Sequence, residues 1–256
     1  MPTAPQIDCP VSLGGFFPAE SDEEEEELNQ CFEIQTVDIA GATFQVRQFA
    51  WHSHNANRVW PGTFNLAQYL LTQNEDGSYQ NQWGHMLELG SATGILAIRL
   101  AAASKQHNPE VTWTVCDSIV TSDVADGEVG DHILFNFNLN DFRNEHIPVH
   151  VPHTWGTGWQ KSAIGLLPEK AGQLPFNTIV ASDILLYVSA YPALVETLTE
   201  IMSPTTVMIM SWNRRMKESI EFFQLMETAG FNCHHEGKCV YTFSWKRQTP
   251  LLLHTP

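Results

Sequence analysis

The second two thirds of the chain alternate short apolar runs with longer helical patterns. Runs of four to six apolar residues bounded by polar ones predict strands, and apolar residues spaced three or four apart predict helices. We expect strands at 85–89, 111–116, 146–151, 178–182 and 207–210, helices at 94–104, 131–140, 191–202 and 218–229, and a closing strand pair at 231–233 and 239–243. Strands that alternate with helices predict an α/β fold with a doubly wound, mostly parallel sheet.

Two further elements precede this alternation. Apolar residues at alternate positions flank residues 38–41, which predicts an N-terminal β-hairpin between about residues 32 and 49. A helix is expected to begin at Pro61, since proline suits the first helical position, where no backbone N–H is needed. We therefore expect one domain of alternating strands and helices over residues 31–248, with short tails at 1–30 and 249–256.

The charge of the chain is uneven. The formal net charge is −16, and Glu20, Asp22 and the run Glu23–Glu27 place seven acids and no base within residues 20–27. With its prolines and the Gly14-Gly15 pair, this segment is predicted to be a disordered acidic tail, either solvating the protein or docking a basic partner. Such acidity argues against a nucleic-acid-binding protein, because the phosphate backbone favours clustered cations.

Composition excludes further classes. No run of about 18 apolar residues predicts a membrane span, and the N-terminus lacks the basic and apolar regions of a signal peptide. Five cysteines at irregular spacing do not form a disulfide framework, which indicates a reducing compartment. We expect a monomer in the cytoplasm, with the nucleus as a second compartment.

The segment Glu88–Leu96 follows a predicted strand and opens a predicted helix. Glycine turns at this position let backbone N–H groups approach a ligand at the sheet edge. Gly90 and Gly94 lack the spacing of a dinucleotide fingerprint, and Glu88 would repel a diphosphate. An acid here suits a cationic or amine-bearing ligand instead.

A second acid, Asp117, follows the predicted strand 111–116, where a carboxylate can accept both ribose hydroxyls of a nucleoside. An amino acid joined to a nucleoside and carrying a sulfonium charge matches Glu88 and Asp117 together: S-adenosylmethionine. The Glu-Leu-Gly-x-x-x-Gly pattern followed by this acid resembles class I, seven-β-strand methyltransferases, which have a Rossmann-like fold.

Three further segments narrow the resemblance. They resemble the lysine-methyltransferase-like family (methyltransferase family sixteen). The first is the stretch 59–70, which contains Trp60 and the pattern Leu-Ala-x-Tyr-Leu. The others are Asn136 and Asn140, which form an Asn-x-x-x-Asn helix end, and the pair Trp155-Gly156. The resemblance covers roughly residues 32–245 and implies a protein methyltransferase that uses S-adenosylmethionine as its cofactor.

The resemblance also implies roles for single residues. The cofactor-binding set that it implies is Trp60, Glu88, Gly90, Ser91, Ala92, Gly94, Asp117, Trp155 and Ser182, and the catalytic pair is Asp183 and Tyr187. Trp155 is expected beside the adenine, Trp60 over the cofactor, and Asp183 at the acceptor. Ala92 stands where many family members have glycine, and Tyr187 is one residue late in the family's Asp-x-x-Tyr motif. Residues 118–130 look like an inserted loop.

Simpler interpretations stand beside these roles. Asp183 could cap local backbone, and Trp60 and Trp155 could be core residues. Cys233, His234, His235 and Cys239 invite a zinc site, but strand alternation sends such side chains to opposite faces, so we expect no metal. His52 and His54 flank the substrate side only if the hairpin forms as predicted. The segment 212–215 could bind an acidic substrate patch or be a solvated turn.

The leading function is a protein methyltransferase that modifies lysine, with a protein substrate, expected to be basic, as partner and with no nucleic acid or membrane. One alternative is a small-molecule methyltransferase on the same scaffold, because a fold does not fix the acceptor. Another is a non-catalytic cofactor-binding interaction module, which the displaced Tyr187 motivates. A nicotinamide dehydrogenase ranks far behind because the glycine spacing is wrong.

Overall fold

The computed structural model describes residues 32–75, 77–104, 115–167, 176–212 and 216–246. Its strands are β1 (Phe32–Ile39), β2 (Ala42–Phe49), β3 (His85–Leu89), β4 (Ser118–Asp123), β5 (Val149–Pro152), β6 (Thr178–Ser182), β7 (Val207–Ser211), β8 (Phe231–Gly237) and β9 (Val240–Trp245). Its helices are α2 (Pro61–Leu70), α3 (Ile95–Ala102), α4 (Gly127–Leu139), α5 (Trp159–Ala163), α7 (Tyr191–Ile201) and α8 (Ser219–Thr228), with short 3₁₀ turns η1 (Asn144–His146) and η2 (Val188–Ala190). The predicted tails 1–30 and 249–256 lie outside the described residues.

Seven strands in the described part of the chain form one sheet in the order β5-β4-β3-β6-β7-β9-β8. The five strands from β5 to β7 are parallel, while β9 runs antiparallel to β7 and β8 antiparallel to β9. The chain builds β3, β4 and β5 outward in one direction and then returns to place β6 beside β3. This reversal makes a switch point between β3 and β6, where open α/β sheets bind ligands. The predicted doubly wound, mostly parallel seven-stranded sheet is confirmed.

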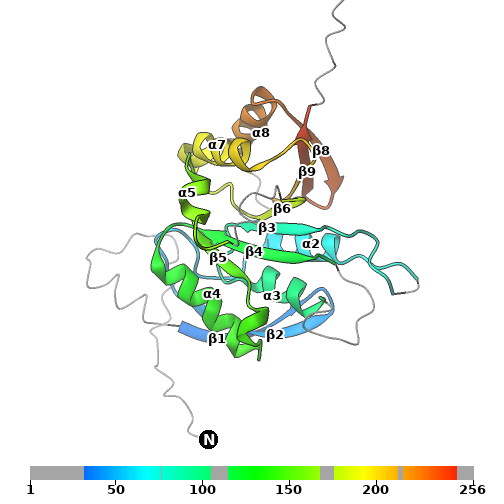
Figure 1. The fold of residues 1–256 in the computed structure, drawn as a ribbon, viewed down its shortest axis with the longest axis vertical. Helices are drawn as coiled ribbons and strands as arrows, with labels where there is room; N and C mark the ends of the chain where they lie inside the picture. Colours follow the sequence, from blue (N-terminus) through cyan, green and yellow to red (C-terminus); the bar gives the residue numbers. More distant parts are fainter. Residues whose placement is uncertain (1–31, 76, 105–114, 168–175, 213–215, 247–256) are drawn as a thin grey trace, which may run out of the picture.

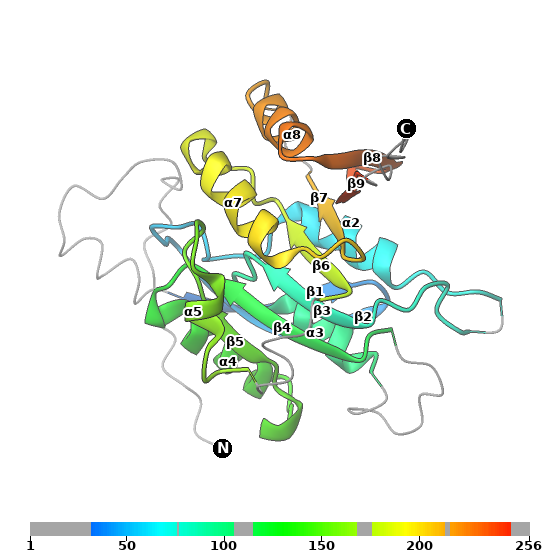
Figure 2. The same cartoon turned by 45° about the horizontal axis from the view of Figure 1, so that its top comes forward.

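Helices cover both faces of the sheet (Figures 1 and 2). On one face lie α3, α4 and the β1–β2 hairpin, and on the other lie α7 and α8. Each face has its own apolar core, and neighbouring residues of one strand supply different cores: Met86 of β3 packs on the hairpin side, and Leu87 packs on the α7–α8 side. A strand buried on both faces reads as a nearly continuous apolar run. This explains why β3 and β6 are visible in the sequence.

The predicted N-terminal hairpin is confirmed, with a two-residue turn at Ala40 and Gly41. Both residues have positive φ angles, 45° and 80°, as the tight turns of twisted hairpins require. No side chain lies within 4 Å of the position that a Gly41 Cβ would take, so the glycine serves the backbone conformation alone.

The hairpin is bound to the domain by Asn136 of α4 and by Asn140, the residue at the C-cap of α4. Asn136 Oδ1 accepts a hydrogen bond from Arg47 N at 2.8 Å, and Asn140 Oδ1 accepts one from Gln45 N at 2.9 Å. Asn140 Nδ2 also donates to Gln45 O at 2.7 Å. The two amide side chains therefore satisfy the free edge of β2 as a further strand would. These are the asparagines that carried the family resemblance.

The region between β3 and β5 corrects the sequence prediction. Residues 111–114 of the expected strand 111–116 lie outside the described residues. The prediction is wrong for Val115 and Cys116, which are not in a strand, and β4 occupies 118–123 instead. Residues 118–130 are not an inserted loop, because they form β4 and the beginning of α4. Asp126 caps α4 by accepting hydrogen bonds from Glu128 N and Val129 N, so the helix starts four residues before its predicted position.

The remaining elements match their predictions closely. β3 and β6 have the predicted bounds, while β5 is shifted three residues toward the C-terminus at its start and one at its end. Pro61 is the first residue of α2, as expected. None of the helices in the described ranges is long and apolar enough to span a membrane.

Candidate active site

A cavity of about 210 Å³ opens at the carboxyl ends of the parallel strands. Its walls come from the segment before α2 and from the loops that follow β3, β4, β5 and β6. Seven of the predicted site residues line it: Trp60, Gly90, Ala92, Trp155, Ser182, Asp183 and Tyr187. Glu88 and Ser91 line a smaller adjoining pocket, together with Trp60 and Ser182. Residues far apart in the sequence thus converge at the switch point between β3 and β6.

The turn after β3 brings the backbone close to the cavity. Gly90, Ala92 and Gly94 all have positive φ angles, of 69°, 48° and 74°. A Cβ atom on Gly90 would lie 2.7 Å from Ile184 Cγ2, so only glycine fits there without a shift of Ile184. Ala92 adopts the left-handed conformation despite its Cβ, at a cost of about 1 kcal/mol. Gly94 precedes α3 and packs against Ile133, so it shapes the turn from outside the cavity wall.

Glu88 is the most deeply buried acid beside this turn, with 2% of its surface exposed. Burial raises the pKa of Glu88 to about 8, and its hydrogen bond to Ser91 opposes that rise. Among the described residues, its Oε2 atom has no hydrogen-bond partner. A buried carboxyl group with a free oxygen is stabilised by an incoming cation, because the cation favours the ionised form. The adjoining pocket therefore suits an amine-bearing ligand.

The predicted ribose acid, Asp117, lies elsewhere. It precedes the first residue of β4, is exposed, and donates its backbone N–H to Gly84 O at the amino edge of the sheet. The acid at the carboxyl end of β4 is Asp123, which lines the cavity. The position expected of Asp117 is thus taken by Asp123, and the error follows from the misplaced strand.

Asp123 is held rigidly at the cavity wall. Its Oδ2 accepts a hydrogen bond from Ala92 N at 2.7 Å, and its Oδ1 accepts one from Val124 N at 2.8 Å. Burial raises the pKa of Asp123, while these two backbone donors lower it. The first bond joins the ends of β3 and β4, so the glycine turn and the acid form one unit.

Asp183 follows β6 directly and has a positive φ of 50°. Its side chain is 2% exposed, and its Oδ2 accepts a hydrogen bond from Gly62 N at 2.6 Å, in the first turn of α2. A Cβ on Gly62 would lie 2.9 Å from this carboxylate, which explains the glycine after Pro61. Next to it, Ser182 Oγ lies 2.9 Å from Thr63 Oγ1. The start of α2 therefore positions both residues, and the partner of Asp183 Oδ2 is the distant Gly62 N–H rather than local backbone.

The segment before α2 forms another wall. Trp60 is buried, its Nε1 donates to Asn55 O at 2.9 Å, and Arg58 lies over its ring at 4.7 Å from the centroid. Asn55 Nδ2 donates to the hydroxyl of Tyr187, whose side chain is 46% exposed at the rim. The late position of Tyr187 in its motif does not remove it from the cavity. Asn55 was missed because a lone asparagine in a loop carries no sequence signal.

Trp155 is half-buried in the loop after β5. That loop is fixed by Thr197 of α7, whose hydroxyl accepts from Gly156 N and donates to Gly156 O, both at 2.9 Å. His153 in the same loop is buried between Ser162 and Thr197, and burial lowers its pKa. The loop thus presents Trp155 to the cavity from a rigid base.

Other candidates separate from the cavity. Cys233 and His234 are exposed on β8, and His235 stacks on Tyr241. Among the described residues, these do not form a group with metal-ligand spacing, whereas His52, His54 and Asp126 do. Of the two histidines expected near the substrate if the hairpin forms, His54 is among the residues that line the cavity and His52 is not. Residues 213–215 of the predicted acidic-substrate patch lie outside the described residues.

Comparisons with known proteins concern the family and the fold of the chain. A family model described as lysine methyltransferase matches residues 42–229. A 16S rRNA N2 G1207 methyltransferase of T. thermophilus, solved with AdoMet and guanosine, shares 16% identity over 84% of this chain and 51% of its own, with a TM-score of 0.51. A ribosomal protein L11 methylase of Lactobacillus delbrueckii subsp. bulgaricus shares 15% identity over 74% of this chain and 81% of its own, with a TM-score of 0.48. The chain spans about half the length of the T. thermophilus protein, and that likeness reflects the fold.

Proposed function

Since the chain belongs to the lysine methyltransferase family, we propose that it transfers methyl groups from S-adenosylmethionine to lysine side chains of a protein substrate. The coarser activity, S-adenosylmethionine-dependent methyl transfer, follows from the family and the fold. The lysine acceptor is supported by one observation above all. The buried carboxylate of Asp183 lies in a cavity whose rim carries the exposed Tyr187, so a long cationic side chain can reach an acid from the surface.

The described residues fit the cofactor. When bound, S-adenosylmethionine supplies an electrophilic methyl group on a sulfonium. Glu88, with its free Oε2, would hold the cofactor's amine, and the turn around Gly90 would approach its methionine end. Asp123, in place of Asp117, would accept the ribose hydroxyls through the second lone pairs of its oxygens. Trp155 and Trp60 would enclose the adenine and the cofactor from opposite walls.

Asp183 would act on the acceptor. A lysine amine attacks only when it is neutral, and it must be aligned with the methyl group. Asp183 is anchored by the Gly62 N–H and can accept a hydrogen bond from the amine, which orients the nitrogen lone pair. Tyr187, tied to Asn55 through its hydroxyl, would line the path of the incoming side chain. Both assignments keep the chain's residues in orienting and electrostatic roles, since the cofactor carries the driving force.

A labelling experiment tests this proposal. The purified chain is incubated with a lysate and isotopically labelled S-adenosylmethionine, and labelled proteins are mapped by mass spectrometry. We expect label on lysines of one or a few proteins. Asp183→Asn retains an oxygen for the Gly62 N–H but removes the charge, so transfer should fall at least 100-fold while S-adenosylhomocysteine affinity stays within threefold.

Asp117→Asn is the matched control, because Asp117 is an exposed acid at the opposite edge of the sheet, and it should leave transfer unchanged. Label found only in small metabolites would favour the small-molecule alternative. Cofactor binding without any transfer would favour a non-catalytic binding module. Undiminished transfer by Asp183→Asn would remove Asp183 from the acceptor site.

A further inference from the structure

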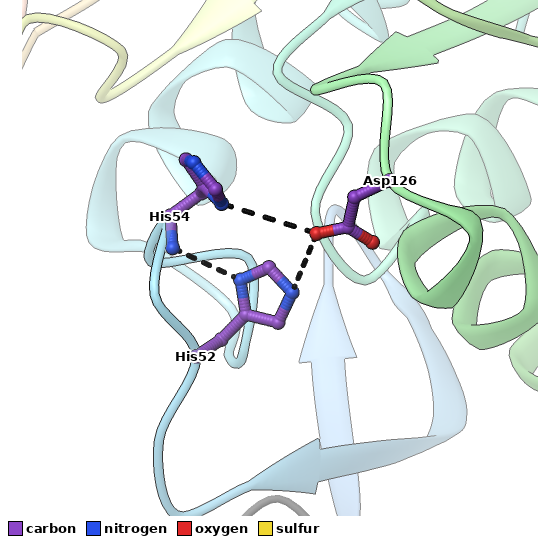
Figure 3. A group of neighbouring side chains, drawn as sticks. All are labelled: His52, His54 and Asp126. Atoms are coloured by element: carbon purple, nitrogen blue, oxygen red, sulfur yellow. Dashed lines mark hydrogen bonds and ion pairs between the residues drawn. The ribbon is translucent and has the colours of Figure 1, made fainter. Parts of the chain in front are cut away.

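Two histidines and an aspartate meet beside the cavity, on segments more than 70 positions apart in the chain. His52 Nε2 lies 3.5 Å from Asp126 Oδ2, and His54 Nδ1 lies 3.9 Å from the same oxygen. Figure 3 shows both rings turned toward this carboxylate. The three potential ligand atoms all lie within 4.8 Å of one another.

The two oxygens of Asp126 have different tasks. Oδ1 accepts hydrogen bonds from Glu128 N at 2.9 Å and Val129 N at 3.3 Å, which caps α4 and fixes the carboxylate. Oδ2 faces the two imidazoles. The capping bonds of Oδ1 therefore hold Oδ2 at a defined position opposite two imidazole nitrogens. Asp126 can cap α4 and bind an ion at the same time, without any rearrangement of the helix.

The surroundings favour a cation. Burial lowers the pKa of His52, whereas the nearby carboxylates of Asp126, Asp123 and Glu128 act in the opposite direction. The His52 side chain is 8% exposed and that of His54 is 52% exposed, so one ligand is firmly placed and the other can adjust from the solvent side. Two ligands of one zinc ion lie about 3–4 Å apart, because each metal–ligand bond is about 2 Å long. Both histidine–aspartate distances fall in this range.

We propose that His52 Nε2, His54 Nδ1 and Asp126 Oδ2 bind a divalent transition-metal ion of the zinc type, with solvent completing the coordination. Two imidazoles and one carboxylate are a donor set that such ions accept with an open fourth position. Binding displaces two contacts of the histidines: the bond from His54 N to His52 Nδ1 at 3.2 Å, and the Ser53 Oγ to His54 Nδ1 contact at 2.9 Å. The proton on His52 moves from Nε2 to Nδ1, so its net charge is unchanged.

The site would act on the cavity through the segment that carries it. His54 and Asn55 both line the cavity, and Asn55 bonds to Trp60 and Tyr187. An ion that joins His52 and His54 to the start of α4 would fix this segment. Metal binding is therefore expected to order the wall between the predicted cofactor and acceptor positions, while the ion itself lies outside the transfer reaction.

Titration calorimetry with Zn²⁺ on chelator-treated full-length protein tests the proposal, with Co²⁺ absorption as a second readout. The wild type should bind one ion at micromolar concentration. His54→Ala removes a half-exposed ligand, and Asp126→Asn keeps a cap oxygen but removes the charge. Each should weaken Zn²⁺ binding at least threefold and diminish the visible Co²⁺ bands, with the melting temperature of the metal-free protein little changed.

His234→Ala is the matched control, because it removes an exposed histidine on β8, away from the cluster, and should bind Zn²⁺ as the wild type does. The control matters because the chain contains 11 histidines and 5 cysteines, which offer weak sites elsewhere. The proposal is overturned if the wild type binds no Zn²⁺ at 100 µM, or if either variant loses less than threefold. None of these readouts depends on methyl transfer.

Discussion

The two ends of the parallel strands are both polar, yet they differ in how their polar groups are used. At the amino edge, polar groups of adjacent strands bind one another. Asn177 Oδ1 accepts a hydrogen bond from His85 N at 2.8 Å, and Asn177 N donates to His85 O at 2.9 Å. His85 Nδ1 lies 2.9 Å from Ser118 Oγ. At the carboxyl edge, buried polar atoms without partners gather instead. Among the described residues these include Glu88 Oε2, Ser122 Oγ and Ser211 Oγ.

The backbone differs in the same way. Ala92 and Asp183, neither of them glycine, hold positive φ angles at the carboxyl edge, beside Gly90 and Gly94. At the amino end of β3 the positive angle belongs to a glycine, Gly84. Unsatisfied groups and strained non-glycine residues persist where something else stabilises them, and they cluster at functional sites. An acid in a loop is therefore a weak indicator of function, whereas an acid beside such features is a strong one.

The largest expected difference between the two edges is in the pH dependence of stability, and it concerns Glu88 at the carboxyl edge. Because its pKa is raised to about 8 in the folded protein, the protonated form is favoured by folding. The contribution of protonated Glu88 to the free energy of unfolding is fully present below the ordinary pKa of 4.5 and is lost as pH rises toward 8. Glu88→Gln mimics the protonated group, so the cofactor-free variant should lose less stability between pH 5 and 8, by on the order of 2–4 kcal/mol.

Melting curves at several pH values measure this difference. Other groups titrate in the same range, so the stability of the variant is subtracted from that of the wild type at each pH. Asp117→Asn, at the amino edge, should follow the wild-type profile. Parallel profiles for wild type and Glu88→Gln would mean that Glu88 is not desolvated as its burial indicates.

The next difference compares the two ends of β4 directly. Asp123→Asn should weaken S-adenosylhomocysteine binding about 10- to 100-fold, because a charged acceptor held by Ala92 N and Val124 N is replaced by a neutral amide. Asp117→Asn should change the affinity less than twofold. Calorimetry measures both, with melting curves to confirm folding. Equal effects from the two variants would sink the assignment of the ribose position to Asp123.

The smallest difference concerns two glycines. A Cβ on Gly90 would lie 2.7 Å from Ile184 Cγ2, and one on Gly84 would clash with Asn177 Oδ1; both glycines have positive φ. Gly90→Ala and Gly84→Ala should therefore each cost about 1–2 kcal/mol in unfolding free energy. Cofactor affinity should fall only for Gly90→Ala. An affinity loss of the same size for Gly84→Ala would show that the amino edge is coupled to the site.

Burial of a strand on both faces of the sheet decides how well its bounds can be predicted from the sequence. The bounds of β3 and β6 were predicted correctly because both are central strands buried on two faces, where the apolar run is unbroken. β4 was missed although it is central too, since Thr121 and Ser122 interrupt its apolar pattern and a β-branched run at 111–115 competes with it. Pairing with β3, which aligns Ser118 with His85, makes 118–123 a strand despite its interrupted pattern. Such pairing is a tertiary effect that local sequence does not contain.

The site shows the same limit. Residues next to a recognisable turn or motif, such as Gly90 and Asp183, were placed at the cavity by the sequence. Asp123 could have been found had the end of β4 been recognised, because an acid at the carboxyl end of a second strand is itself the signal. The approach of Asp126 to His52 and His54 could not, since it depends on how the start of α4 meets the segment after β2.

The asparagines that complete β2 have a consequence for how the chain is made. Asn136 and Asn140 lie 89 and 95 positions after the backbone groups that they bind. During synthesis the hairpin therefore leaves the ribosome well before its lateral partner exists, at a time when its free edge could pair with another chain. Contacts between residues so far apart in sequence also require a large loss of chain entropy before they form. Nascent chains that end before α4 should accordingly be the ones most in need of a chaperone.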